Sequence, residues 1–188
     1  MRNSLGFTIV EMVIAISVMT ILVTLTAVGM LATQANGRDS ERRADVEAIA
    51  KHLDTLYSRG ITVGPTTIKG SYPPTAWIGS DSGSTRAAIL REIPAGSLIA
   101  PQETTSVDSL FAATNALTGT DPTASATSVA PAPSADRPYI YQPIDNTGAL
   151  CTATPPPPTP AQTCRKFNIY AWQETTPNAV IKIESRFR

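Results

Sequence analysis

The first eleven residues read MRNSLGFTIVE (residues 1–11), and an uncharged, largely apolar run of 21 residues from Met12 to Ala32 follows directly. A helix of that length spans about 30 Å at a rise of about 1.5 Å per residue, which matches the hydrocarbon core of a bilayer. Between Phe7 and Ala32 the only charged residue is Glu11. The sequence therefore predicts a membrane-spanning helix that follows a very short basic segment.

An ordinary secretory signal peptide explains this stretch poorly. Such a peptide has a basic start, an apolar run of about 7–15 residues and a small-x-small cleavage site. Arg2 supplies the basic start, but the apolar run is too long and the candidate site Ala27-Val28-Gly29 lies inside it. No cysteine follows the run, which excludes a lipoprotein. A single-pass anchor with Glu11 at the membrane interface stays open as a second interpretation.

The order Gly6-Phe7-Thr8-Ile9-Val10-Glu11 before an apolar span resembles the class III leader of type IV pilins, type II secretion pseudopilins and competence pilins. In that family a short basic leader ends in glycine, phenylalanine usually follows, and the fifth residue after the cut is glutamate. The resemblance implies that prepilin peptidase cuts between Gly6 and Phe7, and that the new amine of Phe7 is methylated. It also implies that Glu11 serves assembly.

Each of these positions has a physical rationale. Gly6 has no side chain, so an extended backbone can enter a protease cleft closely. Glu11 is costly in lipid unless it is paired or lies near the interface. In the low-dielectric core of a filament, the free amine of Phe7 in a neighbouring subunit is a suitable partner for this carboxylate.

The chain divides into a leader (1–6), a membrane or filament-core half of the helix (7–32), an amphipathic half (33–60) and a globular head (61–188). The amphipathic half carries apolar residues at helical spacing, and Gly60 is a plausible stop. They are Val46, Ile49, Ala50, Leu53, Leu56 and Tyr57. One long helix is therefore expected, in which Gly29 and Gly37 are weak points. The mixed charges from Arg38 to Glu47, together with His52, indicate a solvated helix face.

Early in the head, Gly70-Ser71-Tyr72-Pro73-Pro74 indicates a turn. Short helices are expected at 87–93, ended by Pro94, and at 106–117. The stretch 118–138 is rich in Thr, Ser, Ala and Pro, and its composition favours an exposed, mobile loop.

The last part of the head (139–188) is rich in β-forming residues, and 139–141, 167–172 and 180–184 are expected to form an antiparallel meander. Pro143 is expected to end the first of these strands. The fold class is therefore α+β: a long N-terminal helix packed on a C-terminal antiparallel sheet, as in type IV pilins. The proline-rich stretch 152–160 is expected to be extended and stiff.

Two cysteines, Cys151 and Cys164, bracket the proline-rich stretch. They form no C-x-x-C motif and the only histidine, His52, is distant in sequence, so a zinc site or a Cys-His nucleophile is not expected. If the head is exported, a disulfide between the two cysteines is the natural expectation. Two free buried thiols are the alternative.

No motif for catalysis or for a cofactor is recognisable, because the chain has no phosphate-binding glycine loop, no H-E-x-x-H and no G-x-S-x-G. Asp145-Asn146-Thr147-Gly148 lacks the EF-hand spacing and favours a turn over calcium binding. The 15 basic and 15 acidic residues balance, so no overall charge favours DNA. We therefore expect neither an enzyme nor a cofactor-binding protein.

The resemblance implies a structural subunit that leaves the cytoplasmic membrane for an extracellular filament, in adhesion, twitching motility or DNA uptake. The expected partners are further copies of the chain, prepilin peptidase, a membrane assembly platform and a cytoplasmic ATPase. A type II secretion pseudopilin and a membrane-anchored binding module that never polymerises are the two alternatives.

Overall fold

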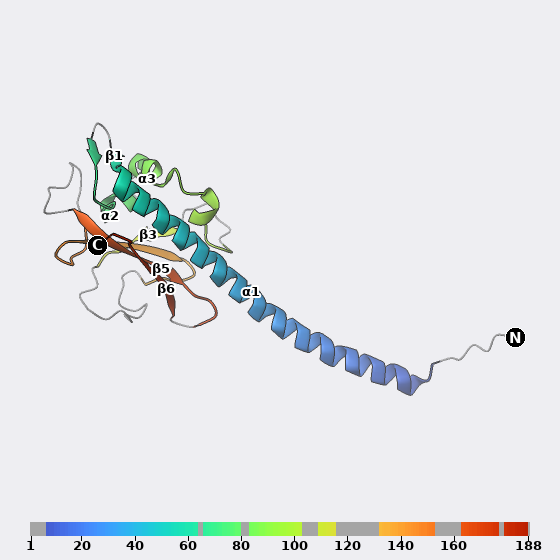
Figure 1. The fold of residues 1–188 in the computed structure, drawn as a ribbon. Helices are drawn as coiled ribbons and strands as arrows, with labels where there is room; N and C mark the ends of the chain where they lie inside the picture. Colours follow the sequence, from blue (N-terminus) through green and yellow to red (C-terminus); the bar gives the residue numbers. More distant parts are fainter. Residues whose placement is uncertain are drawn as a thin grey trace. The chain divides into compact units, whose positions relative to one another are not determined.

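The computed structural model describes residues 7–63, 66–79, 83–102, 109–115, 132–152, 163–176 and 179–187. The chain divides into two compact units, Met1–Gly37 and Arg38–Arg188. Most of the helices and strands belong to the second unit (Figure 1). In chain order the elements are α1 (Ile9–Arg59), β1 (Ile61–Val63), β2 (Thr66–Ile68), α2 (Thr75–Ile78), α3 (Gly83–Leu90), the 3-10 helix η2 (Ala95–Leu98), β3 (Leu110–Ala112), β4 (Tyr139–Asp145), β5 (Cys164–Trp172) and β6 (Val180–Glu184).

Helix α1 confirms the predicted long N-terminal helix, because its hydrogen-bonded turns continue through both Gly29 and Gly37. It ends at Arg59, and the predicted stop at Gly60 has a positive φ of 100°. The amide of Gly60 still donates to the carbonyl of Leu56 at 2.7 Å. A Cβ at Gly60 would lie 2.9 Å from the side chains of Thr67 and Lys69, so both conformation and space require glycine.

The sheet of the second unit has the order β3-β4-β5-β6. Strands β4, β5 and β6 form the predicted antiparallel meander, with Tyr141 opposite Ile169 and Ile169 opposite Ile183. Strand β3 pairs in parallel with the start of β4, so the sheet is mixed rather than purely antiparallel. Strands β1 and β2 form a separate two-stranded sheet directly after α1. The α+β layout expected from the sequence is confirmed.

Two expectations for the head are wrong. The helix predicted at 106–117 is not formed, because Leu110–Ala112 is strand β3. Pro143 does not end the first strand, because β4 continues to Asp145. The carbonyl of Pro143 accepts a hydrogen bond from the amide of Cys151. This bond lies on the side of β4 that faces away from β5. The missing N–H of Pro143 therefore falls on the side that β3 no longer covers, where no ladder bond is lost.

The other expectations for the head are met in part. Helix α3 starts earlier than predicted, at Gly83, and ends at Leu90, three residues before Ile93. The part of the 118–138 stretch that is described, 132–138, includes the buried prolines Pro133 and Pro138. The rest of that stretch and residues 153–160 of the proline-rich stretch lie outside the described residues.

The core of the second unit lies between α1 and the sheet. The predicted apolar positions of α1 are buried here, except for Tyr57, which is half-buried. The partners that they meet are mostly aromatic and come from β4, β5 and the segment before α2. The largest are Tyr72, Tyr139, Tyr141 and Phe167. A second, smaller cluster of Ala113, Ile140 and Tyr170 is buried separately.

Candidate functional site

The N-terminal segment begins with a helix cap. The hydroxyl of Thr8 accepts from the amide of Glu11 at 3.2 Å, and the carbonyl of Thr8 accepts from the amide of Met12. Thr8 and Glu11 stand at the spacing of a capping box, Thr-x-x-Glu, in which the first residue satisfies an unpaired amide of the first helical turn. Helix α1 therefore starts at Ile9, two residues after the predicted cut. The capping box is a signal that the sequence analysis missed.

The hydroxyls of the apolar span bond to the helix that carries them. Ser17 donates to the carbonyl of Val13 and Thr20 donates to that of Ile16, each at 2.8 Å. Thr24, Thr26 and Thr33 make the same kind of bond three or four residues back. Because these donors are satisfied within the helix, they add little cost in an apolar environment.

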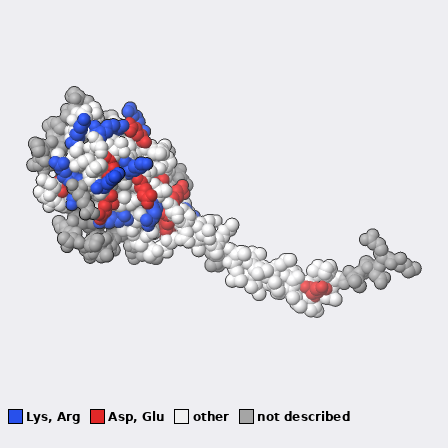
Figure 2. Space-filling model, in the orientation of Figure 1, with Lys and Arg blue, Asp and Glu red and all other residues white. Residues whose placement is uncertain are grey.

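The described large apolar side chains that stand exposed all lie between Phe7 and Leu31. Glu11 is the one charged residue among them, and the first unit is otherwise uncharged in its described part (Figure 2). Helix α1 is long and apolar enough at its N-terminal end to cross a membrane. An isolated helix with this surface requires lipid or protein around it.

The second unit begins with a network of charged residues. The carboxylate of Asp39 accepts from the backbone amides of Glu174 at 2.9 Å and Thr175 at 3.0 Å. It also accepts from the hydroxyl of Thr175 at 2.7 Å and from the guanidinium of Arg42 at 2.8 Å. Arg38 forms a two-pronged ion pair with the carboxylate of Glu174. The network fastens α1 to the turn between β5 and β6.

Most of this network is removed from solvent. The side chain of Arg42 is 2% exposed, and its guanidinium lies 4.8 Å from the centre of the Trp172 ring. Burial opposes ionisation of Asp39, but the hydrogen bonds from Glu174, Thr175 and Arg42 together hold its pKa below the ordinary value. The hydrogen bond from Arg38 likewise lowers the pKa of Glu174. The network is therefore ionised at neutral pH.

The solvated face expected from Arg38 to Glu47 is accordingly wrong in part, because Asp39, Arg42 and Asp45 are buried. The carboxylate of Asp45 accepts from the hydroxyl of Tyr139 at 2.7 Å. Desolvation by burial raises the pKa of Asp45, and this outweighs the hydrogen bond from Tyr139. His52 is half-buried as well, and its Nε2 lies 2.7 Å from the carbonyl of Ile89 in α3. A mixed-sign helical segment does not reveal from sequence which of its charges meet partners elsewhere in the chain.

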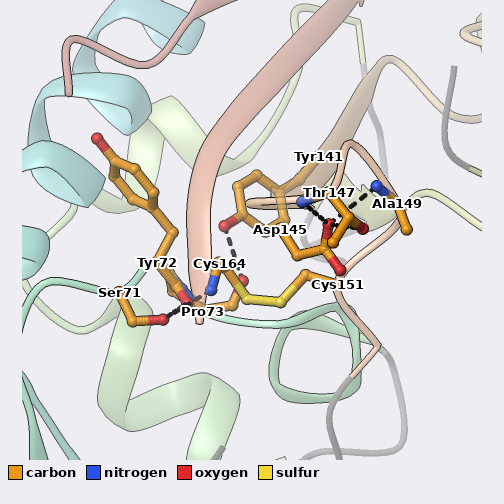
Figure 3. The surroundings of a disulfide bond; sticks show 9 residues. All are labelled: Ser71, Tyr72, Pro73, Tyr141, Asp145, Thr147, Ala149, Cys151 and Cys164. Atoms are coloured by element: carbon orange, nitrogen blue, oxygen red, sulfur yellow. Dashed lines mark hydrogen bonds between the residues drawn. A yellow bond between two sulfur atoms is a disulfide. The ribbon is translucent and has the colours of Figure 1, made fainter. Parts of the chain in front are cut away.

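Cys151 and Cys164 form a buried disulfide, which confirms the pairing that the export argument predicts. Both cysteines also hold the segment before α2 through their backbones, and Figure 3 shows Cys164 beside Ser71 and Tyr72. The amide of Cys164 donates to the hydroxyl of Ser71, and its carbonyl accepts from the amide of Tyr72. The carbonyl of Cys151 accepts from the amide of Thr75. The disulfide therefore marks a junction between β4, β5 and the predicted turn at 70–74.

The Asp145 loop is a turn, as the sequence indicates. One carboxylate oxygen of Asp145 accepts from the amide and the hydroxyl of Thr147 and from the amide of Ala149 (Figure 3). Burial opposes ionisation of Asp145, yet these bonds hold its pKa below the ordinary value. In the described part of the chain, no group of three or more His, Cys, Asp or Glu residues is placed to hold a metal ion.

The predicted site residues fall into separate groups. Phe7 and Glu11 belong to the first unit, whereas Cys151 and Cys164 meet in the second. Gly6 lies outside the described residues. Cleavage, methylation and the role of Glu11 in assembly therefore stay predictions of the sequence.

The apolar N-terminal helix fits membrane anchoring of a prepilin, and the α+β layout is consistent with a type IV pilin-like fold. Residues 1–31 match the family model of the prokaryotic N-terminal methylation motif. This match supports the resemblance to type IV pilins and pseudopilins, whose class III prepilin leader the segment carries. No curated protein and no solved structure matches the chain. The leader implies processing by prepilin peptidase and assembly into a pilus or pseudopilus.

Proposed function

We propose that this chain is a structural subunit of an extracellular type IV pilus-like filament. It is made as a prepilin, cut between Gly6 and Phe7, methylated at the amine of Phe7, and held in the cytoplasmic membrane until an ATPase-driven platform assembles it. The filament serves adhesion, twitching motility or DNA uptake. In this proposal the chain acts as the substrate of processing enzymes and has no catalytic role of its own.

The observation that carries this proposal is the exposed apolar surface between Phe7 and Leu31, which directly follows a leader matched by the methylation-motif model. That surface requires a cover, and a membrane and the helices of further subunits are both apolar covers. The one charge within it, Glu11, stands in the first turn of α1. The amine of Phe7 in a neighbouring subunit would neutralise it.

The test is to shear surface material from the producing cells and to measure the intact mass and the N-terminal residue of this protein. Filaments that contain residues 7–188, with one added methyl group at the amine of Phe7, are the expected result. Protein that starts at Met1, or at Met30 within the apolar run, would contradict the proposal.

Two further measurements separate the alternatives. A deletion strain that loses its secreted enzymes but keeps its surface filaments would identify a type II secretion pseudopilin. Correctly cut protein that stays entirely in the membrane fraction would identify an anchored binding module that does not polymerise.

A further inference from the structure

Five exposed cations from separate segments meet at the end of the second unit where α1 stops. They are Arg59, Lys69, Arg91, Arg165 and Arg186, and together they are called the cationic patch. Arg59 and Arg91 line one hollow of about 470 Å³, which lies between the end of α1, the start of β1 and the residues that follow α3. Because the five residues are distant in the chain, the balanced overall charge does not reveal the patch.

Contacts at the end of β2 place two more of these cations beside the hollow. A Cβ at Gly60, the residue after Arg59, would lie 2.9 Å from Cγ of Lys69, so the stem of Lys69 packs against the end of α1. The guanidinium of Arg165 donates to the carbonyl of Gly70, the residue after Lys69, at 3.2 Å. Arg59, Lys69 and Arg165 therefore lie in one row.

Tyr57 links the last cation to this row. Its hydroxyl accepts from the guanidinium of Arg165 at 3.3 Å, and its ring stacks on that of Phe187 with the centroids 4.9 Å apart. Arg186 directly precedes Phe187, and its backbone amide donates to the carboxylate of Asp54 at 3.3 Å. The cationic patch therefore extends from the hollow to the C-terminal segment.

The cationic patch stays positive after its carboxylates are counted. The segments that meet here are residues 54–62, 67–74, 89–93, 163–165 and 185–187. Their only acidic residues are Asp54 and Glu92, so five cations against two carboxylates leave a net charge of +3. Glu92 is paired with Arg59 at 2.9 Å, and Asp54 already accepts from the hydroxyl of Tyr72.

The charges around the patch do not neutralise it. On α1, Glu47 stands one turn before Lys51, and on β6 the carboxylate of Glu184 is paired with the ammonium of Lys182 at 2.8 Å. In the described part of the chain, Lys69, Arg91 and Arg165 form no ion pair with a carboxylate. Their charges are therefore available to an anionic partner.

The side chains of the cationic patch favour a polymer of phosphates as that partner. Four of the five cations are arginines, whose planar guanidinium matches a phosphate with two parallel hydrogen bonds. The cations come from separate segments, and a linear polyanion reaches several of them at once. A membrane surface fits less well, because membrane-binding surfaces insert apolar side chains and the described large apolar side chains that stand exposed all lie between Phe7 and Leu31.

We propose that the cationic patch binds the phosphate backbone of double-stranded DNA without reading its sequence. This inference rests on the proposed filament function, because it selects DNA uptake from the roles proposed for the filament. Duplex DNA carries one negative charge about every 1.7 Å along its axis, so a short length presents several phosphates to the patch. Contacts with phosphates position a duplex and carry no sequence information directly.

The test is binding of a short, fluorescently labelled DNA duplex to the full chain in uncharged detergent micelles, followed by anisotropy over a range of salt concentrations. The logarithm of the association constant should fall linearly with the logarithm of the salt concentration, with a slope of about −0.9 for each phosphate contact. The variant Lys69→Glu with Arg91→Glu should bind at least about tenfold more weakly, and its slope should be smaller by about two. Duplexes of unrelated sequence should bind equally.

A matched control reverses two exposed cations outside the patch, Arg43→Glu with Arg137→Glu, so that the total charge changes equally. It is expected to keep the wild-type affinity and slope. Equal losses in both variants would show an effect of net charge alone and would overturn the inference. Poly-glutamate that competes as well as unlabelled duplex at equal charge would overturn the assignment to phosphate.

A second variant guards against a folding defect. Lys69→Gln with Arg91→Gln removes the same two charges without new carboxylates, and it should lose less affinity than the reversal. Wild-type urea unfolding midpoints confirm that the variants fold. No binding of DNA by the wild-type chain at low salt, while the chain is present in sheared filaments, would overturn the inference and leave the proposed function standing. Absence of the chain from sheared filaments would instead overturn the proposed function.

Discussion

Replacement of Asp39 by alanine is expected to destabilise the head strongly, although Asp39 is distant in sequence from the predicted processing site. Its carboxylate accepts four hydrogen bonds, two from backbone amides of the β5–β6 turn, one from the Thr175 hydroxyl and one from Arg42. Removal of one partner from a buried ion pair costs about 3–5 kcal/mol. Glu174 stays within 3.7 Å of the Arg42 guanidinium and offsets part of the loss, so we expect a value near 3 kcal/mol.

The assay is urea unfolding of the full chain in detergent micelles, followed by tryptophan fluorescence, because the Trp172 ring lies beside Arg42. The matched control is Glu41→Ala, which removes an exposed carboxylate from the same helix and is expected to change the free energy of unfolding by less than about 0.5 kcal/mol. The variant Asp39→Asn tests the same network at constant size. It turns one acceptor oxygen into a donor that faces other donors, and it is expected to be destabilised as well.

The pH dependence gives a second signature of the same carboxylate. The folded-state pKa of Asp39 lies below its ordinary value, so its contribution to stability is complete above the unfolded-state pKa of about 3.9 and is lost as the pH falls through the folded-state pKa. The difference between wild type and Asp39→Ala should therefore shrink in acid. A free energy of unfolding for Asp39→Ala within about 0.5 kcal/mol of wild type at pH 7 would refute this reasoning.

Three further predictions concern the N-terminus and the disulfide. Glu11→Ala should reach the membrane and be cut normally, because removal of a charge eases insertion. It should nevertheless give few filaments when membrane and sheared fractions are compared. Normal filaments in that comparison would remove the ion-pair role of Glu11. A bulky residue in place of Gly6 should leave uncut protein in the membrane, which an immunoblot of membrane fractions would detect. Cleavage at the wild-type level would contradict the argument that Gly6 lets the backbone enter the protease cleft closely. Loss of the disulfide through Cys151→Ser with Cys164→Ser should lower the free energy of unfolding by about 3 kcal/mol in the chain-entropy model. The loss is smaller if the proline-rich loop is already stiff in the unfolded chain. Unchanged urea unfolding curves would contradict this prediction.

The parts of the fold that follow from local pattern were predictable from the sequence. The length of α1, its stop at Gly60 and its buried stripe all depend on spacing along one element. The meander of β4, β5 and β6 follows from β-rich runs of adequate length. The disulfide follows from the two cysteines together with the expectation that the head is exported.

The parts that depend on contacts between distant segments were not predictable. Strand β3 has three residues and becomes a strand through its pairing with Tyr139–Tyr141, so its sequence alone does not distinguish it from a helix. Pro143 is tolerated in β4 because β3 is too short to reach it, which no local rule reveals. The burial of Asp39 depends on a turn 135 residues further along the chain. By contrast, the capping box of Thr8 was readable from the sequence.

The inward hydrogen bonds of the serine and threonine hydroxyls in α1 have a mechanical consequence. With those donors engaged, two such helices that lie side by side meet through apolar side chains, and their serine and threonine hydroxyls do not fix the axial offset through interhelical hydrogen bonds. In the proposed filament, the pairing of Glu11 with the amine of a neighbouring Phe7 would then be the polar contact that sets the axial offset. A bundle built from these helices would be held along its axis by one polar contact in each subunit. Such a bundle would be able to lengthen under load and to return when the load is removed.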